Sequence, residues 1–313
     1  MRRSAKPISG SVPLNGRDES LALEFITQVV INGILFGSMY GVAAIGLSLI
    51  FGTMRIVFIA QGSVIVLFAY CCFWLFSLLG IDPYLSLIPI ILVSLLLGAG
   101  FYYGLFKEAA ALKDRIGSLL IAVGLMFFLE NFMTVVWSPN PRAVVTSYGF
   151  VVFHLFGINL TLTRLIGLLL ALLATVGVAT FLRKTLIGTA VRATSEDVEA
   201  STLMGINPNR VNAVTFAIGI GLAALAGTTL ATTYSFDPIY GFDFAIKALV
   251  ALTLGGIGRV YGALLGGILL GLIELLGTYF VGAGWAQAIV FAVFLLALTF
   301  RPYGIFGGAS EKV

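Results

Sequence analysis

Long, uninterrupted apolar runs constrain this chain more than any other feature. Between residues 25 and 300, stretches of about 20 residues with almost no charges alternate with short polar ones, and that length matches a bilayer-spanning α-helix. Only 10% of the 313 residues are charged, whereas about a quarter are charged in a soluble domain. We therefore expect an all-α polytopic membrane protein.

The apolar runs are continuous rather than alternating, which excludes a transmembrane β-barrel. They lie at 25–50, 58–79, 84–106, 116–137, 161–182, 211–234, 244–281 and 285–300. The run 244–281 is long enough for a broken pair of helices, interrupted by glycines at its centre. The Gly-rich stretch 25–57 is expected to cross twice as a tight, broken pair, which gives roughly eight to ten crossings in all.

Basic residues predict the orientation. If the runs alternate, most basic loop residues fall on one side, which the positive-inside rule assigns to the cytoplasm. They are Lys107, Lys113, Arg115, Arg183, Lys184, Arg192, Arg210, Arg301 and Lys312. The loop 138–160, expected to form a small hairpin, then lies outside. We expect a disordered polar tail at 1–24, one transmembrane domain at 25–307 and a cytoplasmic tail at 308–313.

The sequence lacks the common catalytic and nucleotide-binding motifs. No Gly-Lys-Ser/Thr P-loop, GxSxG, HExxH or CxxC motif occurs. Cys71 and Cys72 are adjacent inside an apolar run, and His154 is the only histidine. We therefore expect no catalytic residue, metal or cofactor on this chain. The net charge of +4 fits membrane topology rather than nucleic acid binding.

A polar segment at 192–210 interrupts the second half of the chain. Thr194 and Ser195 can cap a helix start, whereas Gly205 and Pro208 are suited to ending it. The segment predicts a helix of about three turns, too short and too charged to span a bilayer. Its candidates for contact with a protein outside the membrane are Ser195, Glu196, Asp197, Glu199, Leu203, Met204 and Gly205. A solvated helix face with ordinary capping would explain the same residues.

Breaks and isolated charges inside the apolar runs are candidates for lining a translocation path. Backbone exposed at a break is tolerated only against protein or a water-filled cavity, and an ionisable group within a span is a functional candidate. The candidates are Gly52, Phe58, Gln61, Gly62, Gly255, Gly256, Gly258, Glu130 and Glu274. Close packing through glycine and structural hydrogen bonds are the competing explanations. Lys247 and Arg259 are expected to snorkel to the interfaces.

A short spacing pattern occurs at two of these breaks. Gly52 and Arg55 are spaced like Gly256 and Arg259, and a further glycine follows at the same distance in both places. Internal repeats with broken helices are typical of transporters, whose substrate path lies near the breaks. Three matched positions also arise by chance in a chain this rich in glycine.

Four stretches, in order, resemble permeases of branched-chain amino acid ABC importers. They are GLSLIFGTMRIVFIAQGS at 46–63, the polar segment followed by VNAVTFAIGIGLAALAG at 211–227, LGGIGRVYGALLGGILLGLIE at 254–274 and RPYGIFG at 301–307. The resemblance covers nearly everything from Phe25 to Gly307 and is strongest to the shorter, H-type permease. Where the family often has Asn-Phe-Ala-His-Gly, this chain has Phe-Ile-Ala-Gln-Gly at 58–62.

The resemblance implies a transport subunit of the bacterial inner membrane rather than an enzyme. Such a permease pairs with a second, related permease in contact with membrane lipid. Two ATP-binding cassette subunits bind the ATP and dock on 192–210 as a coupling helix, and a periplasmic binding protein delivers the solute. A branched-chain amino acid is the implied solute, with urea, short amides and aromatic carboxylates as alternatives because positions 58 and 61 depart from the family.

Two other classes of function compete with this interpretation. An ATP-independent secondary transporter or channel would group ionisable residues at mid-membrane, and the polar segment 192–210 would have no purpose in it. An integral membrane enzyme would need a polar catalytic cluster near an interface. The chain has few intramembrane charges and no such cluster, so the importer permease is the leading hypothesis.

Overall fold

The computed structural model describes residues 16–111, 115–155, 158–256, 258–300 and 304–305. The helices in chain order are α1 (Gly16–Met54), α2 (Gln61–Leu79), α3 (Leu87–Phe101), the π-helical turn η1 (Tyr102–Phe106), α4 (Lys107–Ala111), α5 (Arg115–Trp137), the 3-10 turn η2 (Ser147–Phe150), α6 (Leu162–Lys184), α7 (Leu186–Glu196), α8 (Val198–Leu203), α9 (Pro208–Thr233), α10 (Tyr240–Gly255), α11 (Val260–Val281) and α12 (Ala283–Phe300). Seven helices among the described residues are long and apolar enough to cross a membrane. The all-α polytopic architecture is therefore confirmed.

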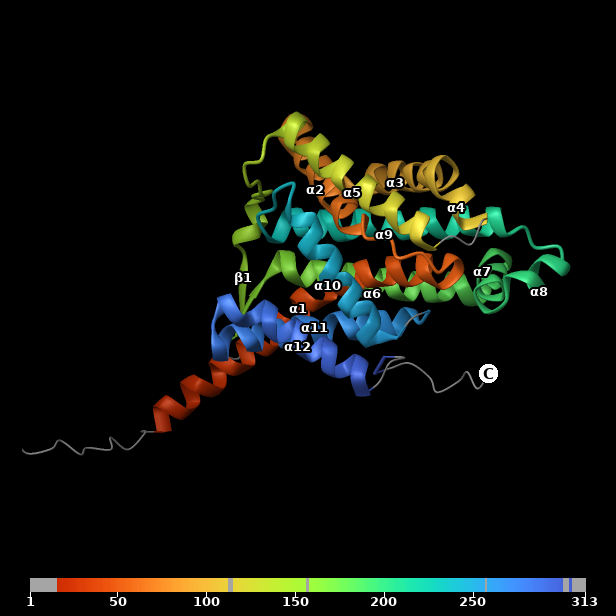
Figure 1. Ribbon diagram of the computed structural model, residues 1–313. Coiled ribbons are helices and arrows are strands. Elements are labelled where there is room, and N and C mark those ends of the chain that lie inside the picture. Colours follow the sequence, from red (N-terminus) through yellow and green to blue (C-terminus); the bar gives the residue numbers. More distant parts are fainter. Residues whose placement is uncertain (1–15, 112–114, 156–157, 257, 301–303, 306–313) are drawn as a thin grey trace, which may run out of the picture.

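The long helices form a bundle whose two ends differ (Figure 1). One end carries the predicted hairpin, in which β1 (Val152–Leu155) pairs antiparallel with β2 (Ile158–Thr161). The opposite end, which we call the α7–α8 end, carries these two short helices. The basic residues of α4, the last turn of α6, α7 and the first turn of α9 lie there, as alternation of the runs predicts. The positive-inside rule assigns this end to the cytoplasm.

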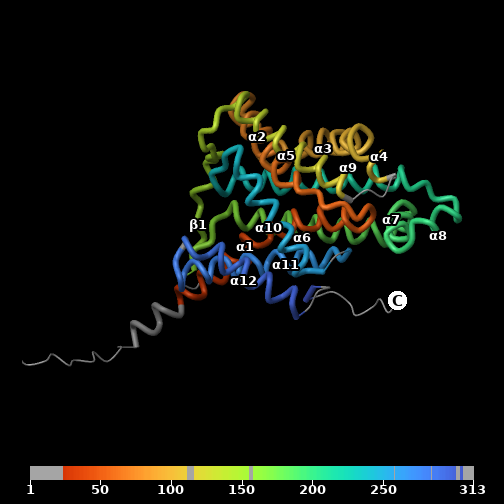
Figure 2. Tube along the Cα trace, in the orientation of Figure 1, coloured from red at the N-terminus to blue at the C-terminus, as the bar shows by residue number. Residues whose placement is uncertain are grey.

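The predicted double crossing of 25–57 is wrong, because α1 is one continuous helix from Gly16 to Met54. It starts beyond the hairpin (Figure 1) and runs through the bundle (Figure 2), so the chain enters from the hairpin end. Part of the predicted tail 1–24 is also helical, from Gly16 onward, while residues 1–15 and 308–313 lie outside the described residues. The glycines of α1 do not break it, because close packing against neighbouring helices offsets their low helix propensity.

α1 and α9 are the central helices of the bundle. Most of the apolar window of each helix is buried, 83% for α1 and 78% for α9, against 22% for α6. The backbones of α1 and α11 approach closely at their glycines. A Cβ added at Gly37 of α1 would lie 2.5 Å from Gly267 O and 2.6 Å from Ile268 Cα of α11. Small residues at such crossings allow van der Waals packing of backbone on backbone. The regularly spaced glycines of the first run thus allow the close helix packing at the core of the bundle.

Two helix breaks lie side by side at the α7–α8 end of the bundle. The predicted break between α10 and α11 is confirmed, with positive φ at Gly256 (88°) and Gly258 (79°). The other follows α1, where Arg55 has a φ of 54°, which is uncommon without glycine. Gly258 N–H donates to Ser48 Oγ of α1 at 3.1 Å, so the two stretches with repeated spacing meet in space.

Hydrogen bonds tie the loops of the hairpin end together. The Tyr148 hydroxyl donates to Asp82 Oδ2 at 2.7 Å, and Arg142 pairs with Phe236 through two backbone hydrogen bonds of 2.9 Å. Burial and the neighbouring Asp82 raise the pKa of Tyr148, so its hydroxyl stays protonated at neutral pH. These contacts join the loops that follow α2, α5 and α9.

Candidate functional site

The polar segment folds into two short helices rather than the single helix predicted. α7 begins after Thr185, whose Oγ1 accepts from Gly188 N–H at 2.9 Å. Asp197 then adopts an extended backbone and caps α8, its Oδ1 accepting from Glu199 N–H at 2.8 Å and Ala200 N–H at 3.0 Å. An aspartate cap satisfies the free amides of a helix start. The helix start was therefore predicted at the wrong residues, since Thr194 lies buried inside α7.

The end of the segment follows the predicted signals only in part. Gly205 has a φ of 83°, the left-handed conformation that suits a glycine after a helix. Pro208 was expected to stop a helix, but it lies in the first turn of α9, where its missing N–H is tolerated. Asn207 caps that turn, its Oδ1 accepting from Asn209 N–H at 3.0 Å.

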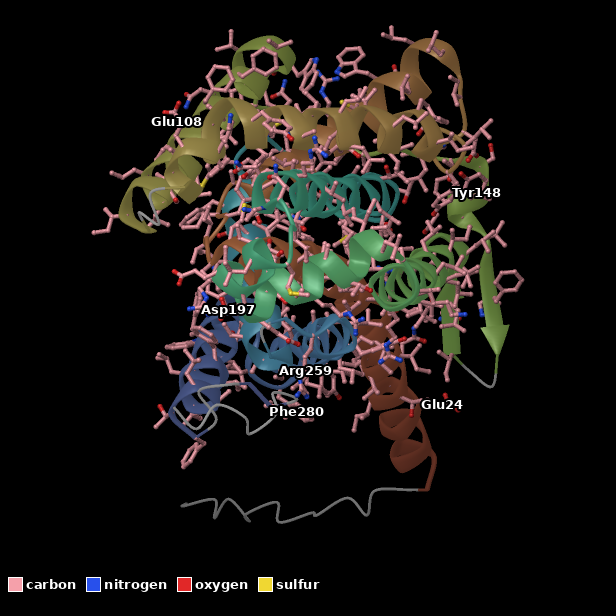
Figure 3. The ribbon with its side chains drawn as sticks, turned by 90° about the vertical axis from the view of Figure 1, so that its right-hand side faces the viewer. Glu24, Glu108, Tyr148, Asp197, Arg259 and Phe280 are labelled. Carbon is pink, nitrogen blue, oxygen red and sulfur yellow. The ribbon has the colours of Figure 1, made fainter. Side chains whose placement is uncertain are left out.

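The tip of α8 projects from the bundle with apolar side chains uncovered. Leu203 is 88% exposed and Met204 is 83% exposed, and the carboxylates of Glu196, Asp197 and Glu199 are exposed beside them. Figure 3 looks onto this end, where α7 and α8 cross in front of the bundle. Exposed apolar residues rimmed by polar ones mark an interaction surface.

A cavity of about 620 Å³ lies between this segment and the end of α1. Four of the predicted coupling residues line it, namely Ser195, Glu196, Asp197 and Glu199. Gly52, predicted for the translocation path, lines it as well, together with Arg55 and Asn209. The structure thus brings the polar segment 192–210 and the first helix break to one cavity. Asn209 was not predicted as a site residue. Its only signal in the sequence is that it is a polar residue in the first turn of an apolar helix.

The path candidates around 58–62 lie in the protein core. Phe58 is fully buried, and its ring centroid lies 4.9 Å from that of Phe216 and 5.6 Å from that of Phe106. Gln61 is also fully buried and donates from Nε2 to Gly219 O at 3.3 Å. Gly62 packs directly on the backbone of Gly241. All three residues thus pack closely against neighbouring helices, and their place on a translocation path stays a prediction.

The path candidates at the second break divide between core and surface. Gly255 packs against the backbone of Gly262, since a Cβ added to it would lie 2.5 Å from Gly262 C. Gly256 is buried, whereas Gly258 is exposed and lines a separate pocket of about 500 Å³. Close packing is thus observed for Gly255, and a path-lining role of these glycines stays a prediction.

The intramembrane charges make contacts between helices. Glu130 of α5 accepts a hydrogen bond from Ser63 Oγ of α2 at 3.1 Å. Glu274 of α11 pairs with Lys247 of α10 at 2.6 Å, and Lys247 also donates to the Tyr40 hydroxyl of α1 at 3.2 Å. Lys247 does not snorkel as predicted, since the side chains of the pair are only 16% and 15% exposed. Charges of opposite sign on the two sides of the predicted break in the run 244–281 were the signal for this pair.

Comparison with known proteins identifies the family. The family described as "Branched-chain amino acid transport system / permease component" matches residues 29–298. This chain belongs to that permease family. It is 32% identical to the high-affinity branched-chain amino acid transport system permease protein BraD of Pseudomonas aeruginosa, over 91% of this chain and 97% of BraD. It is 31% identical to LivH of Escherichia coli K12, over 92% of this chain and 98% of LivH.

A more distant relative of this permease is the ribose import permease RbsC of Bacillus subtilis, 26% identical over 80% of this chain and 75% of RbsC. No solved structure matches the chain. Family membership confirms a transport permease component rather than an enzyme, in a multi-pass inner-membrane protein. As such a component, the permease works with the other parts of a transport system.

Removing one partner of the Lys247–Glu274 pair is expected to destabilise the permease. Lys247→Met or Glu274→Leu leaves a charge without its counter-ion among apolar helices, which costs about 3 kcal/mol. The double substitution removes both charges and is expected to recover most of that loss. Thermal unfolding of the purified protein in detergent, as a double-mutant cycle, measures this coupling. Losses that simply add in the double variant would show that the two side chains do not stabilise each other.

Proposed function

We propose that this permease is one half of the membrane pore of an ATP-driven importer for a branched-chain amino acid. The observation that carries the proposal is the projecting tip of α8, with Leu203 and Met204 uncovered at the end where basic residues gather. A partner on that side would cover the tip. In this proposal two ATP-binding cassette subunits dock there, a second permease lies beside this one, and a binding protein delivers solute at the hairpin end.

The connections of the α7–α8 segment suit a coupling role. Thr185 joins α6 to α7 without a flexible loop, because its backbone N–H bonds to Phe181 O at 3.2 Å and its side chain caps α7. At the other end, Asn207 caps α9 directly after the segment. Closure of two ATPase subunits would therefore tilt α6 and α9. Since α9 is mostly buried, its movement would reach the core and switch access between the two sides.

ATP binding belongs to the partners in this proposal. The chain has no P-loop sequence, so a nucleotide-binding subunit has to supply the energy of transport. The solute class rests on the names of BraD and LivH, which are branched-chain amino acid permeases. The more distant relative RbsC is a ribose import permease, so proteins similar to this chain differ in the solute they carry. Urea, short amides and aromatic carboxylates are therefore outcomes that the transport assay has to test.

Affinity purification of this permease together with the proteins bound to it tests this proposal. The full chain is solubilised in detergent and captured by an affinity tag, and co-purifying proteins are identified by mass spectrometry. We expect a P-loop ATPase and a second permease, and ATP-dependent uptake of labelled leucine when the assembly is reconstituted with its binding protein. Recovery of this chain alone, moving solute in liposomes without ATP, would instead establish a secondary transporter or channel.

A further inference from the structure

A second pocket at the α7–α8 end has no role in the proposed coupling. It has a volume of about 500 Å³ and lies where α6, α7 and the start of α11 meet. It shares no lining residue with the cavity between α1 and α8. Arg259, at the edge of this pocket, is labelled in Figure 3 below α7 and α8.

Three arginines from three different elements line this pocket. Arg183 comes from the last turn of α6, Arg192 from α7, and Arg259 from the residue before α11. The Arg183 guanidinium lies over the ring of Tyr261, 5.7 Å from its centroid. No acidic residue is among the described residues that line the pocket. Guanidinium groups bind phosphate through paired, charge-assisted hydrogen bonds, so the pocket suits a phosphate group.

The pocket has space for a ligand where Gly258 lines it. A Cβ added at Gly258 would meet nothing within 4 Å, so the backbone at this position faces open space. A side chain at Gly258 would extend into this space. Gly262 also lines the pocket, but its missing Cβ faces the backbone of Gly255.

The remaining lining residues are apolar and continue toward the membrane. They include Ala179 and Leu182 of α6 and Val260 and Leu265 of α11. Both helices are membrane-crossing candidates, and the pocket lies at the end of each. Ala179 is about one turn further into the bilayer than Arg183, and Leu265 is more than one turn along α11 from Arg259. The pocket therefore joins a basic mouth at the membrane boundary to an apolar groove.

We propose that this pocket binds an anionic phospholipid of the cytoplasmic leaflet, with its phosphate held by Arg183, Arg192 and Arg259. Basic pockets between membrane helices on the cytoplasmic side are suited to acidic headgroups. The apolar groove between α6 and α11 accommodates the start of an acyl chain. A soluble phosphate or a nucleotide has no acyl chain, so the groove favours a lipid. A lipid bound there bridges α6 and α7 to the break ahead of α11. The proposal does not depend on which solute the permease carries.

Native mass spectrometry of the purified full chain tests this site. The permease is delipidated in detergent and titrated with phosphatidylglycerol or with phosphatidylcholine of the same acyl chains. We expect one phosphatidylglycerol to be retained selectively. Arg183→Gln combined with Arg259→Gln should lower its apparent affinity by at least about tenfold, from the loss of two cationic contacts. Inorganic phosphate in excess should not displace the lipid.

Two further variants keep the test decisive. Lys184→Gln removes a neighbouring basic residue that does not line the pocket, so it should leave retention unchanged. Arg192→Gln alone, on the exposed face of α7, tests the site if the double variant fails to fold, and should lower affinity by roughly fivefold. Equal retention of both lipids, displacement by phosphate alone, or an equal loss in Lys184→Gln would each overturn the proposal.

Discussion

Substituting Gly37 by leucine is expected to prevent recovery of folded permease, whereas the same substitution at Gly124 should be tolerated. A side chain at Gly37 would collide with the backbone of α11, because its Cβ alone would lie 2.5 Å from Gly267 O and 2.6 Å from Ile268 Cα. Backbone atoms in a packed core cannot move aside as a flexible side chain can. Gly124 of α5 has nothing within 4 Å of such a Cβ and is exposed.

The alanine variants give the sharper comparison, because their effects should have opposite signs. Alanine is a better helix former than glycine by about 1 kcal/mol, so Gly124→Ala should be neutral or slightly stabilising. Gly37→Ala should destabilise by about 2 kcal/mol or more, because overpacking forces α1 and α11 apart. Thermal transitions followed by size-exclusion chromatography in detergent measure both. Equal melting temperatures for the two alanine variants would show that the α1–α11 contact does not hold the bundle together.

The same glycines show where sequence reasoning succeeded and where it failed. Their spacing in 25–50 correctly predicted a small-residue face, but the stretch was also predicted to break and cross twice. Glycine favours both outcomes, since it weakens a helix and allows close packing. What decides between them is a partner surface on α11, more than 200 residues away in the chain. No local pattern contains that information.

The snorkelling predicted for Lys247 was wrong for a related reason, whereas the path candidates stay predictions. The sequence locates Lys247 within an apolar run, but only the rotation of α10 against α11 decides whether it reaches the interface or Glu274. Phe58 and Gln61 drew attention as departures from a family motif, yet both are core residues in this fold. The break at 255–258 was predictable because three glycines within four positions leave few other backbone solutions.

The polar segment was predicted better in its location than in its local structure. Its charge and length excluded a membrane span, and the structure places it at the end of the bundle. Thr194, Ser195 and Asp197 are all suitable caps, so local propensity could not choose among them. Burial decides, because Thr194 packs inside α7 while Asp197 is exposed. The cap therefore falls at Asp197, the only fully exposed residue of the three.

Replacing Leu203 and Met204 together by arginine is expected to abolish ATP-driven uptake while leaving the permease folded. Both side chains are more than four-fifths exposed, at 88% and 83%, so their substitution should change stability by less than about 0.5 kcal/mol. If the ATPase covers them, burying two arginines in its apolar contact should cost 2 kcal/mol or more, which weakens binding by about thirtyfold. Co-purification of the ATPase and leucine uptake in proteoliposomes measure the two effects.

Leu186→Arg is the matched control for this variant. Leu186 is 92% exposed and lies on the same segment, but it is the first residue of α7, directly after the last turn of a membrane-crossing helix. An arginine there extends from the membrane boundary into water, so ATPase binding and uptake should be retained. Full uptake by the Leu203 and Met204 variant would show that the tip of α8 is not the coupling contact. Equal loss in the Leu186 variant, which adds a single arginine elsewhere on the segment, would assign the effect to the charge of the whole segment.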